Sequence, residues 1–425
     1  MEMTMNTALL TDHYELTMLQ AALTGGTAHR RAVFEVFARR LPAGRRYGLV
    51  AGTGRILDAI ENFRFGTREL EFLRDVVDRR THDFLAGFRF SGDIYGYREG
   101  ETYFPGSPIL VVEGTFAEAV LLETVVLSIL NHDCAIASAA GRMTHAAGDR
   151  PIIEMGSRRT HEQAAVAAAR AAYLCGFGST SNLMAGLRYG VPTAGTAAHA
   201  FTLLHDSERA AFGSQLASLG NGTTLLVDTY DVAEAVRTAV ELAGPELGAV
   251  RIDSGDLGPV AVEVRNLLDS LGAHRTRIIV TGDLDEFAIA GLASAPVDGY
   301  GVGTSLVTGS GAPTANLVYK LVTRDDATGT ARPVAKRSVG KPSKGGRKWA
   351  YRELRDGTAT AELVTLAPAE DAGRPLLTPL VRDGEIVGRE PLADARARVR
   401  ASLTELPPIA HSLSPGDPSI PTIFK

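Results

Sequence analysis

Length, composition and charge describe an ordinary globular protein and exclude several classes. The chain has 425 residues, 45% of them hydrophobic and 22% charged, which is enough for a large core and two domains. A net charge of −5 gives no electrostatic basis for binding nucleic acid or an anionic membrane. The two cysteines, Cys134 and Cys175, lack metal-site spacing and fit a reducing compartment. Without a signal-like start or an apolar run of about 20 residues, the sequence predicts a soluble, cytoplasmic protein.

The first part of the chain, residues 1–140, predicts an N-terminal α+β domain. Asp12 and Glu15 have the spacing of a capping box at the start of a short helix, Tyr14–Leu23. The strand-like and helical runs that follow do not alternate strictly, which favours an α+β arrangement. The predicted strands are Ala32–Phe37, Tyr47–Gly52, Phe88–Tyr97 and Pro108–Phe116, and the helices are Ile56–Asn62 and Arg68–Asp75. A long helix, Ala117–Ala140, ends this domain.

Residues 141–330 show a different pattern, in which short apolar runs alternate with helical segments. This alternation is typical of parallel strands joined by crossover helices. The predicted strands are Pro151–Met155, Gly176–Ser179, Val191–Gly195, Thr223–Val227, Ala249–Asp253, Arg277–Val280 and Gly299–Val302. About seven βα units predict an α/β fold with an incomplete TIM-like (β/α) barrel.

The last part, residues 331–425, predicts a few strands and a proline-rich tail that return to the N-terminal domain. It begins with a basic, glycine-rich stretch, Lys336–Lys348. Trp349 is the one aromatic residue at the edge of this stretch, and the chain as a whole is acidic. The stretch therefore predicts a solvated turn rather than a nucleic-acid patch.

Polar side chains follow several of the predicted barrel strands, and His199 is the most informative of them. It comes after a strand-like run, with only Thr196 and small residues beside it. An imidazole suits proton or phosphoryl chemistry near neutral pH, and barrel strand ends are where side chains converge on substrate. Asp228, at the next strand end, is placed to bind one ring nitrogen and leave the other nucleophilic. The alternative is a structural histidine held by a hydrogen bond.

Two arginine positions indicate an anionic ligand. Arg158 and Arg159 follow the first barrel strand. They are either guanidinium groups that bind phosphate or carboxylate through parallel hydrogen bonds, or a solvated pair at the start of a helix. Arg251 lies inside an apolar run, so its charge must meet a partner. That partner is either an internal Asp253 or Asp256, or a carboxylate or phosphate on a ligand.

Carboxylates, glycines and hydroxyls complete this predicted face. The carboxylates of Asp253, Asp256, Asp283 and Asp285 suit ribose hydroxyls or Mg²⁺ held through waters, although Asp283 alone could be a helix cap. Gly301, Gly303, Thr304 and Ser305 form the last strand end, a frequent place for phosphate. Tyr14 is either a hydrophobic contact of the first helix or an aromatic plate for a planar ligand.

Six ordered motifs within residues 5–355 resemble those of the nicotinate phosphoribosyltransferases, of the type II phosphoribosyltransferase group. They are T-D-H-Y-E-L-T-M from Thr11, E-M-G-S-R-R from Glu154, G-V-P-T-A-G-T-A-A-H-A-F from Gly190, V-D-T-Y-D from Val227, V-R-I-D-S-G-D-L from Val250 and G-V-G-T-S-L-V-T from Gly301. The resemblance implies transfer of phosphoribosyl from 5-phosphoribosyl-1-pyrophosphate to nicotinate, giving nicotinate mononucleotide and pyrophosphate for NAD biosynthesis. It also implies Mg²⁺, ATP as a co-substrate that yields ADP and phosphate, and a homodimer with shared active sites.

The same resemblance assigns expected roles residue by residue. His199 is the residue transiently phosphorylated by ATP, and Asp228 and Arg251 act with it. The nicotinate pocket is expected to hold Tyr14, Arg158, Thr196 and Arg251. The phosphoribosyl and phosphate side is expected to hold Arg158, Asp253, Gly282, Asp283, Gly303 and Thr304.

Two alternatives remain at this level. A nicotinamide phosphoribosyltransferase carries an aspartate near the position of Gly190, which would repel a carboxylate, so Gly190 favours nicotinate. A non-catalytic barrel that binds phosphorylated metabolites would need the phosphate-binding residues but not His199.

Overall fold

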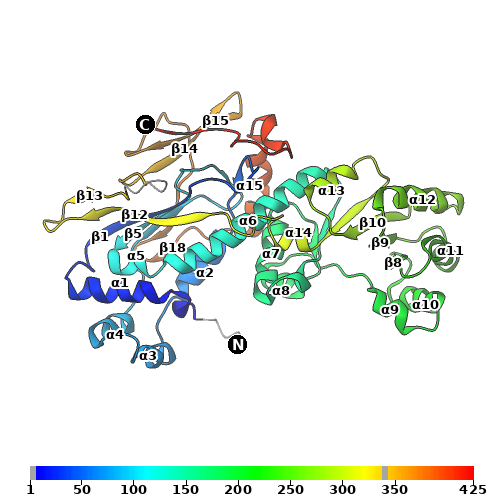
Figure 1. The fold of residues 1–425 in the computed structure, drawn as a ribbon, viewed down its shortest axis with the longest axis horizontal. Coiled ribbons are helices and arrows are strands. Elements are labelled where there is room, and N and C mark those ends of the chain that lie inside the picture. Colours follow the sequence, from blue (N-terminus) through cyan, green and yellow to red (C-terminus); the bar gives the residue numbers. More distant parts are fainter. Residues whose placement is uncertain (1–5, 337–342) are drawn as a thin grey trace. The chain divides into compact units, whose positions relative to one another are not determined.

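The computed structural model describes residues 6–336 and 343–425, which form a mixed α/β fold of two compact units (Figure 1). The first unit combines the chain up to Ser138 with the chain from Ala312 onward, and the second is the continuous segment Ala139–Gly311. The expected boundary at residue 330 therefore falls within the first unit. The reason is that strand β12 (Leu317–Asp325) pairs with β1 (Arg31–Ala38).

A seven-stranded sheet forms the centre of the first unit, and all its described strand pairs are antiparallel. Its order is β13 (Ala331–Pro333), β12, β1, β5 (Leu110–Thr115), β3 (Asp93–Gly96), β17 (Thr378–Arg382) and β18 (Glu385–Ile386). Because β1 lies between β12 and β5, segments nearly 300 residues apart, such as Val36 and Tyr319, pair directly.

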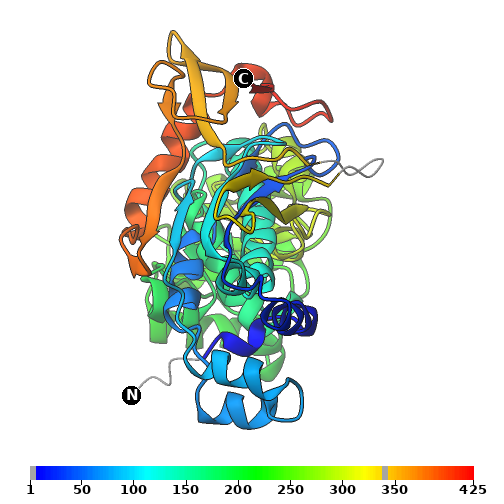
Figure 2. The ribbon, with the colours of Figure 1, turned by 90° about the vertical axis from the view of Figure 1, so that its left-hand side faces the viewer.

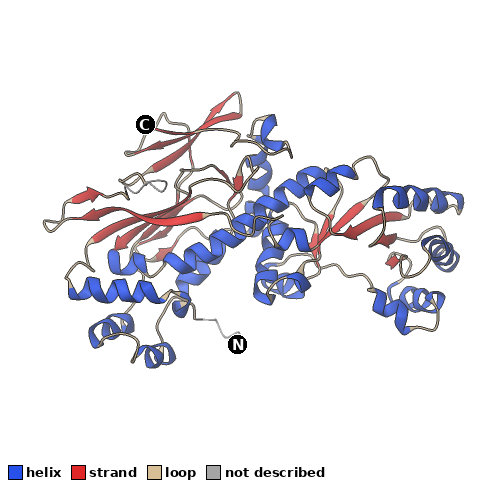
Figure 3. Ribbon diagram, viewed as in Figure 1, coloured by secondary structure: helices blue, strands red, loops and turns tan. Residues whose placement is uncertain are grey.

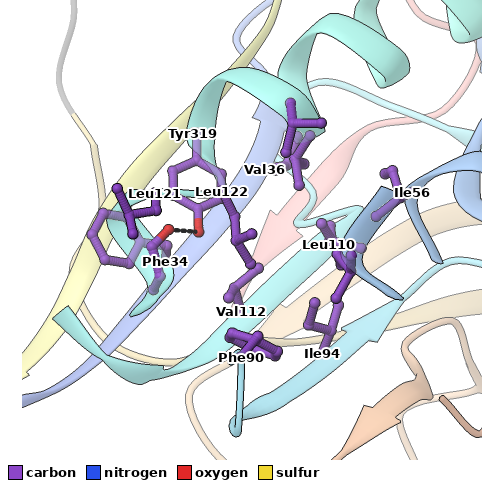
Figure 4. Packing of buried hydrophobic residues seen from close by; sticks show 14 of the residues in the cluster. Phe34, Val36, Ile56, Phe90, Ile94, Leu110, Val112, Leu121, Leu122 and Tyr319 are labelled. Atoms are coloured by element: carbon purple, nitrogen blue, oxygen red, sulfur yellow. Dashed lines mark hydrogen bonds between the residues drawn. The ribbon is translucent and has the colours of Figure 1, made fainter. Parts of the chain in front are cut away.

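The core of this unit lies between the sheet and its helices (Figure 4). Phe34 and Val36 of β1 and Val112 of β5 are buried in it. Tyr319 stacks on Phe34 with ring centroids 4.9 Å apart, and its hydroxyl donates to the carbonyl of Ala119 at 2.8 Å. The buried phenol therefore keeps a hydrogen-bond partner.

Further helices and two small sheets complete the first unit (Figure 2). The helices are α1 (His13–Thr24), α2 (Thr53–Glu61), α3 (Thr67–Leu73), α4 (Arg79–Ala86), α5 (Phe116–Val120) and α15 (Leu392–Thr404). One sheet pairs β2 (Gly48–Leu49) with β4 (Thr102–Tyr103), and the other has the order β16 (Arg374–Pro375), β14 (Trp349–Arg355), β15 (Thr358–Thr365) and β19 (Thr422–Phe424). In the second of these, Arg352 and Glu362 form a fully buried ion pair at 2.7 Å.

The expectation of a solvated turn at Lys336–Lys348 is wrong at its C-terminal end. Lys348 is buried, and its ammonium donates to both carboxylate oxygens of Glu35 at 2.8 and 2.9 Å. The neighbouring Arg347 stacks on Trp349. A buried lysine needs an opposite charge, which a composition-based prediction could not supply. Residues 337–342 of this stretch lie outside the described residues.

The second unit contains a six-stranded sheet in which every described pair is parallel (Figure 3). Its order is β7 (Ser179–Thr180), β6 (Ile152–Glu154), β11 (Gly299–Val302), β10 (Arg277–Gly282), β9 (Ala249–Ile252) and β8 (Thr224–Leu226). The intervening helices are α7 (Glu162–Leu174), α8 (Leu183–Tyr189), α9 (His199–Leu204), α10 (Glu208–Leu219), α11 (Val232–Ala243), α12 (Leu257–Ser270), α13 (Glu286–Gly291) and α14 (Thr304–Val307). The parallel order brings the C-terminal ends of these strands to one edge.

One predicted strand of this unit, Val191–Gly195, is wrong as a strand. Only an isolated parallel bridge forms there, between Thr193 and Thr180. Pro192 has no N–H to donate, and Gly195 has no side chain to pack, so the segment cannot sustain a ladder.

The predicted long helix Ala117–Ala140 is two helices, α5 and α6 (Glu123–Ala147). The break is stabilised because Thr124 donates its backbone N–H to Glu15, as in the first turn of a new helix. Within the described residues, α6 alone has the length and apolar composition of a membrane span, but 72% of its most apolar window is buried inside the fold. It is therefore a core helix.

The capping box expected at Asp12 and Glu15 is also absent. Asp12 is the N-cap of α1 but makes no side-chain hydrogen bond to the helix. The carboxylate of Glu15 instead accepts a hydrogen bond from the hydroxyl of Thr11. It also accepts one from the backbone N–H of Thr124 at 2.9 Å and one from the Thr124 hydroxyl at 2.5 Å. Burial raises the pKa of Glu15 to about 6, although these hydrogen bonds oppose the rise.

We expect the stability of the wild-type protein relative to Glu15→Gln to fall as the pH rises from about 4.5 to 6.5. A carboxyl with a higher pKa in the folded state favours folding while it is protonated, and this contribution is lost as the pH passes the folded pKa of about 6. The rise from 4.5 to about 6 corresponds to about 2 kcal/mol. Urea unfolding across this pH range measures it, with the exposed Glu263→Gln as the matched control. A stability difference that does not change with pH would contradict the prediction.

Candidate active site

The site is organised around Arg251, a charged residue on a buried strand. Arg251 lies on β9 and is 8% exposed. Its guanidinium donates to Oγ1 of Thr281 at 3.0 Å, to Oγ1 of Thr196 at 2.6 Å and to the carbonyl of Ala197 at 3.1 Å, and lies 3.3 Å from Oδ1 of Asp253. The internal ion pair left open by the sequence is therefore present, and three further groups hold the same side chain.

The register of β9 and β10 explains why these side chains meet. Side chains two residues apart on a strand share a face, so Arg251 and Asp253 project together. Arg251 is paired with Ile279 in the parallel ladder, which brings Thr281, two residues on, beside Asp253. Thr281 donates its hydroxyl to Asp253. Burial alone would raise the pKa of Asp253, but the Thr281 hydroxyl and the Arg251 guanidinium hold it below its ordinary value.

A polar cavity of about 260 Å³ opens beside Arg251. It is lined by Met155, Arg158, Arg159, Arg251, Asp253, Thr281, Gly282, Asp283, Gly301, Gly303 and Thr304. The cavity brings together every residue expected on the phosphoribosyl side and two of those expected at the base. Three guanidinium groups and two carboxylates give it the mixed charge suited to an anionic, hydroxyl-rich ligand.

The loop after β6 brings Arg158 to this cavity. Glu154, buried at the end of β6, accepts hydrogen bonds from the backbone of Gly156 and the hydroxyl of Thr180. Burial raises the pKa of Glu154. Asn182 also donates to Ser157 at 2.9 Å. These bonds fix the short 3₁₀ turn that carries Arg158.

Glycine at position 301 keeps the cavity open. Gly301 is paired with Thr281 across β10 and β11. A Cβ at position 301 would collide with the methyl group of Thr281 and lie 2.8 Å from Sδ of Met155. Both neighbours line the cavity, so any larger residue at this position would displace its wall.

Asp283 is available to a ligand because it does not cap a helix. The N-cap of α13 is Asp285, which accepts the backbone N–H groups of Phe287 and Ala288 at 2.9 and 2.8 Å. The cap predicted at Asp283 is therefore wrong by two residues. Asp283 lies at the cavity instead.

Helix α9 is labelled in Figure 1. His199 is its first residue, and the side chain of His199 is partly exposed. Nδ1 lies 3.1 Å from Oγ1 of Thr229. Nε2 lies 3.8 Å from Oδ1 of Asp228 and 3.8 Å from Oδ2 of Asp253. These last separations exceed a hydrogen bond, so the expected bond from the ring to Asp228 is not formed.

Asp228 is held by the strand beside it. Its side chain is 3% exposed, and Oδ2 accepts from the backbone of Asp253 at 2.9 Å and from the hydroxyl of Ser254 at 2.6 Å. Oδ1, which faces His199, is buried without a hydrogen-bond partner among the described residues. The carboxylate is thus fixed in place with one oxygen free for another group.

Tyr14, the remaining expected site residue, belongs to the other unit. It lies on α1 and is 43% exposed. Burial of its hydroxyl and the nearby carboxylate of Glu123, with which it forms a hydrogen bond, raise the pKa of its phenol. Gly190, used above to weigh the base, ends α8 with a φ of 67° and does not line the cavity.

Three residues at the site were not singled out from the sequence: Met155, Thr229 and Thr281. Met155 and Thr229 lie inside motifs quoted above, and Thr281 directly follows the predicted strand Arg277–Val280, but the sequence does not reveal which side chains face the site. Strand phase and register decide this. β10 is a continuous buried run without alternation, so its pattern does not mark Thr281, and Thr229 lies in a loop that carries no periodic signal.

Comparisons with known proteins identify the family of the chain. Residues 9–131 match the family model of the nicotinate phosphoribosyltransferase (NAPRTase) N-terminal domain. The chain is 61% identical to nicotinate phosphoribosyltransferase pncB1 of Mycobacterium tuberculosis, over 97% of this chain and 94% of that one. Among solved structures, human nicotinic acid phosphoribosyltransferase matches with a TM-score of 0.83 at 27% identity, over 98% and 97% of the two chains. A nicotinate-nucleotide pyrophosphorylase from Pyrococcus furiosus matches with a TM-score of 0.76 at 25% identity, over 94% and 96%.

The parallel α/β sheet, its arginine-lined cavity and these likenesses define an enzyme of the pyridine phosphoribosyltransferase class. Within that class, the chain belongs to the nicotinate phosphoribosyltransferase family.

We expect Gly301→Ala to lower the free energy of unfolding by about 1–3 kcal/mol, because overpacking displaces Thr281 and Met155. Chemical denaturation measures the change. Gly178→Ala is the matched control, since a Cβ there would meet nothing closer than 3.8 Å. Equal effects of the two substitutions would contradict the steric explanation.

Proposed function

We propose that this protein transfers phosphoribosyl from 5-phosphoribosyl-1-pyrophosphate to nicotinate, in a reaction coupled to ATP. The observation that carries the proposal is the convergence of Arg158, Arg251, Asp253 and Asp283 on one cavity, beside the His199 ring. The family of the chain supports the same reaction class. The products would be nicotinate mononucleotide, pyrophosphate, ADP and phosphate, as NAD biosynthesis requires.

The residues of the cavity would have separate roles in the transfer step. The pyridine nitrogen of nicotinate would form a bond to C1 of the ribose while the bond from C1 to the pyrophosphate oxygen breaks. Arg251 and Thr196, already hydrogen-bonded to each other, would meet the pyridine carboxylate. Asp253 and Asp283, with Gly282, would accept the ribose hydroxyls, and Arg158, Gly303 and Thr304 would take the phosphate.

The leaving pyrophosphate develops negative charge in the transition state, so fixed cations nearby lower the barrier. Arg158 and Arg159 supply such cations at the cavity wall. Because Arg251 is held by four groups before any ligand binds, its geometry needs little reorganisation during the reaction.

His199 would couple ATP to this transfer through a transient phosphohistidine. A ring nitrogen would attack the γ-phosphorus of ATP, ADP would leave, and water would later release inorganic phosphate. The partial exposure of the ring leaves a path for this attack. The phosphate never enters the mononucleotide, so its effect would be to organise the neighbouring pyrophosphate site.

The residues present fit Mg²⁺ that is held mainly by substrate. Among the described residues, no group of three or more histidine, cysteine, aspartate or glutamate side chains could hold a metal ion alone. Oδ1 of Asp228 is buried without a hydrogen-bond partner, which fits a carboxylate that completes the shell of a phosphate-bound cation. Asp228 and Asp253 would hold the ion, which supplies charge neutralisation at the pyrophosphate when it is bound.

The wider architecture extends this proposal. The parallel sheet, with the bridge at Thr193 beside β7, supports an incomplete TIM-like barrel. Tyr14 lies outside the unit that holds the cavity and is exposed, which supports a homodimer in which Tyr14 completes the nicotinate pocket of the partner. The two cysteines, Cys134 and Cys175, are both buried, which supports a cytoplasmic location.

The alternatives make different demands on the cavity. A nicotinamide-specific enzyme needs an acceptor for the amide, whereas Arg251 offers donors suited to a carboxylate. A regulator that only binds phosphometabolites needs no histidine beside two carboxylates. Both alternatives are tested by the choice of base and by the need for His199.

Mononucleotide formation from 5-phosphoribosyl-1-pyrophosphate, with nicotinate, nicotinamide or quinolinate and with or without ATP, tests the function. We expect product from nicotinate, raised by ATP with matching ADP release. His199→Ala should abolish both the ATP stimulation and the transfer of ³²P from γ-labelled ATP to the protein. A His199→Ala variant whose product formation is still fully stimulated by ATP would contradict the phosphohistidine intermediate. Product from nicotinamide alone would move the function to the first alternative.

Mixing two variant subunits tests the shared site, with the ATP-stimulated activity as the readout. If Tyr14 completes the partner's pocket, co-expressed Tyr14→Ala and His199→Ala chains form mixed dimers with one intact site. Random pairing then restores about a quarter of the wild-type activity. Each variant expressed alone is the control. Activity no higher than the sum of the two variants would contradict sharing.

A further inference from the structure

The ring of His199 makes one hydrogen bond among the described residues, and its partner is Thr229. Nδ1 of His199 lies 3.1 Å from Oγ1 of Thr229, in the loop between β8 and α11. The other nitrogen, Nε2, points between two carboxylates, Asp228 and Asp253, with 3.8 Å to each. The two nitrogens of the ring therefore meet opposite chemical surroundings.

Both carboxylates are fixed in place by their neighbours. Asp228 is anchored through Oδ2 by the backbone of Asp253 and the hydroxyl of Ser254. Asp253 is anchored by the guanidinium of Arg251 and the hydroxyl of Thr281. Neither carboxylate can therefore turn away from Nε2 without breaking contacts that the rest of the site depends on.

This arrangement selects a tautomer of the neutral imidazole. A neutral ring carries one proton, and two nearby carboxylates favour that proton on Nε2. Nδ1 then has the lone pair. A threonine hydroxyl can donate as well as accept, so the Thr229 O–H completes the arrangement by donating to Nδ1.

We propose that Thr229 is a positioning residue, whose hydroxyl fixes the orientation and tautomer of His199 and keeps Nδ1 as the unprotonated nitrogen of the ring. The inference rests on the proposed function only for its consequence in catalysis. The hydrogen bond holds the ring at one torsion in the resting enzyme, and the incoming phosphoryl donor displaces the Thr229 hydroxyl from Nδ1. Without the hydrogen bond from Thr229, the partly exposed His199 ring between two carboxylates is free to rotate.

The direct test is ¹⁵N NMR of the histidine side chains in the full-length protein, with His199→Gln identifying the His199 signals. In the wild type we expect Nε2 to be protonated and Nδ1 to be a hydrogen-bonded, unprotonated nitrogen. In Thr229→Val, which keeps the shape and loses the hydroxyl, the Nδ1 signal should shift toward that of an unbonded nitrogen or average between tautomers. Thr229→Ser should restore the wild-type pattern. Identical His199 signals in the wild type and Thr229→Val, or a protonated Nδ1 in the wild type, would overturn the proposal.

Kinetics supply the second readout. Loss of one hydrogen bond to the ring should lower kcat up to about tenfold and leave the KM values within about twofold, because the hydroxyl touches His199 and not the substrates. Thr229→Ser should recover most of the loss. Thr404→Val, which removes a hydroxyl bonded within its own helix in the other unit, is the control for the substitution itself. A Thr229→Val variant with wild-type kcat, or one that Thr229→Ser does not rescue, would count against a positioning role.

The two experiments separate this inference from the proposed function. The NMR measurement needs no ATP and no base. If His199 were never phosphorylated but the tautomer depended on Thr229, the proposed coupling would fail and the positioning role would stand. If ³²P labelled His199 and the tautomer ignored Thr229, the reverse would hold.

Discussion

The structure depends on one constraint, which is that the charge of Arg251 is buried on a strand. An unpaired guanidinium in this position would cost several kcal/mol, so its partners have to be fixed with it. Asp253 and Thr281 meet it from the same edge of the sheet, and Thr196 meets it from the loop before α9. Satisfying this one charge therefore sets the register of two strands and attaches the His199 segment to them. The site is organised before any ligand arrives.

That organisation extends through backbone as well as side chains. Asp228 reaches the same cluster by accepting the N–H of Asp253, so a carboxylate beside His199 is fixed by the residue that also pairs with Arg251. The surroundings of the histidine are thus strongly negative on one side, and the guanidinium groups lie at the cavity.

Much of this could be predicted from the sequence because strand ends are local features. Polar residues directly after apolar runs, such as Asp228 and Asp253, must lie at one edge of a parallel sheet, wherever the strands sit in the order. The errors arose where non-local contacts decide. Nothing near Lys348 in the sequence indicates that Glu35 would bury it, and nothing near Thr124 indicates that Glu15 would help to break the long helix. The apolar start of the Val191–Gly195 segment led to the prediction of a strand, but its proline and glycine prevent a continuous ladder of hydrogen bonds. The direction of the Thr229 hydroxyl depends on a loop conformation that no pattern encodes.

The pairing of β1 with β12 has a consequence for synthesis on the ribosome. The first unit is interrupted in the chain by the whole of the second, so strand β1 lacks one of its two neighbours until the segment that begins at Leu317 has been made. The second unit, Ala139–Gly311, emerges in one continuous stretch and has all its strands earlier. Domains usually fold in the order in which they are translated. In this protein the N-terminal segment comes first from the ribosome and its sheet is completed last, and until then one edge of β1 has no paired strand.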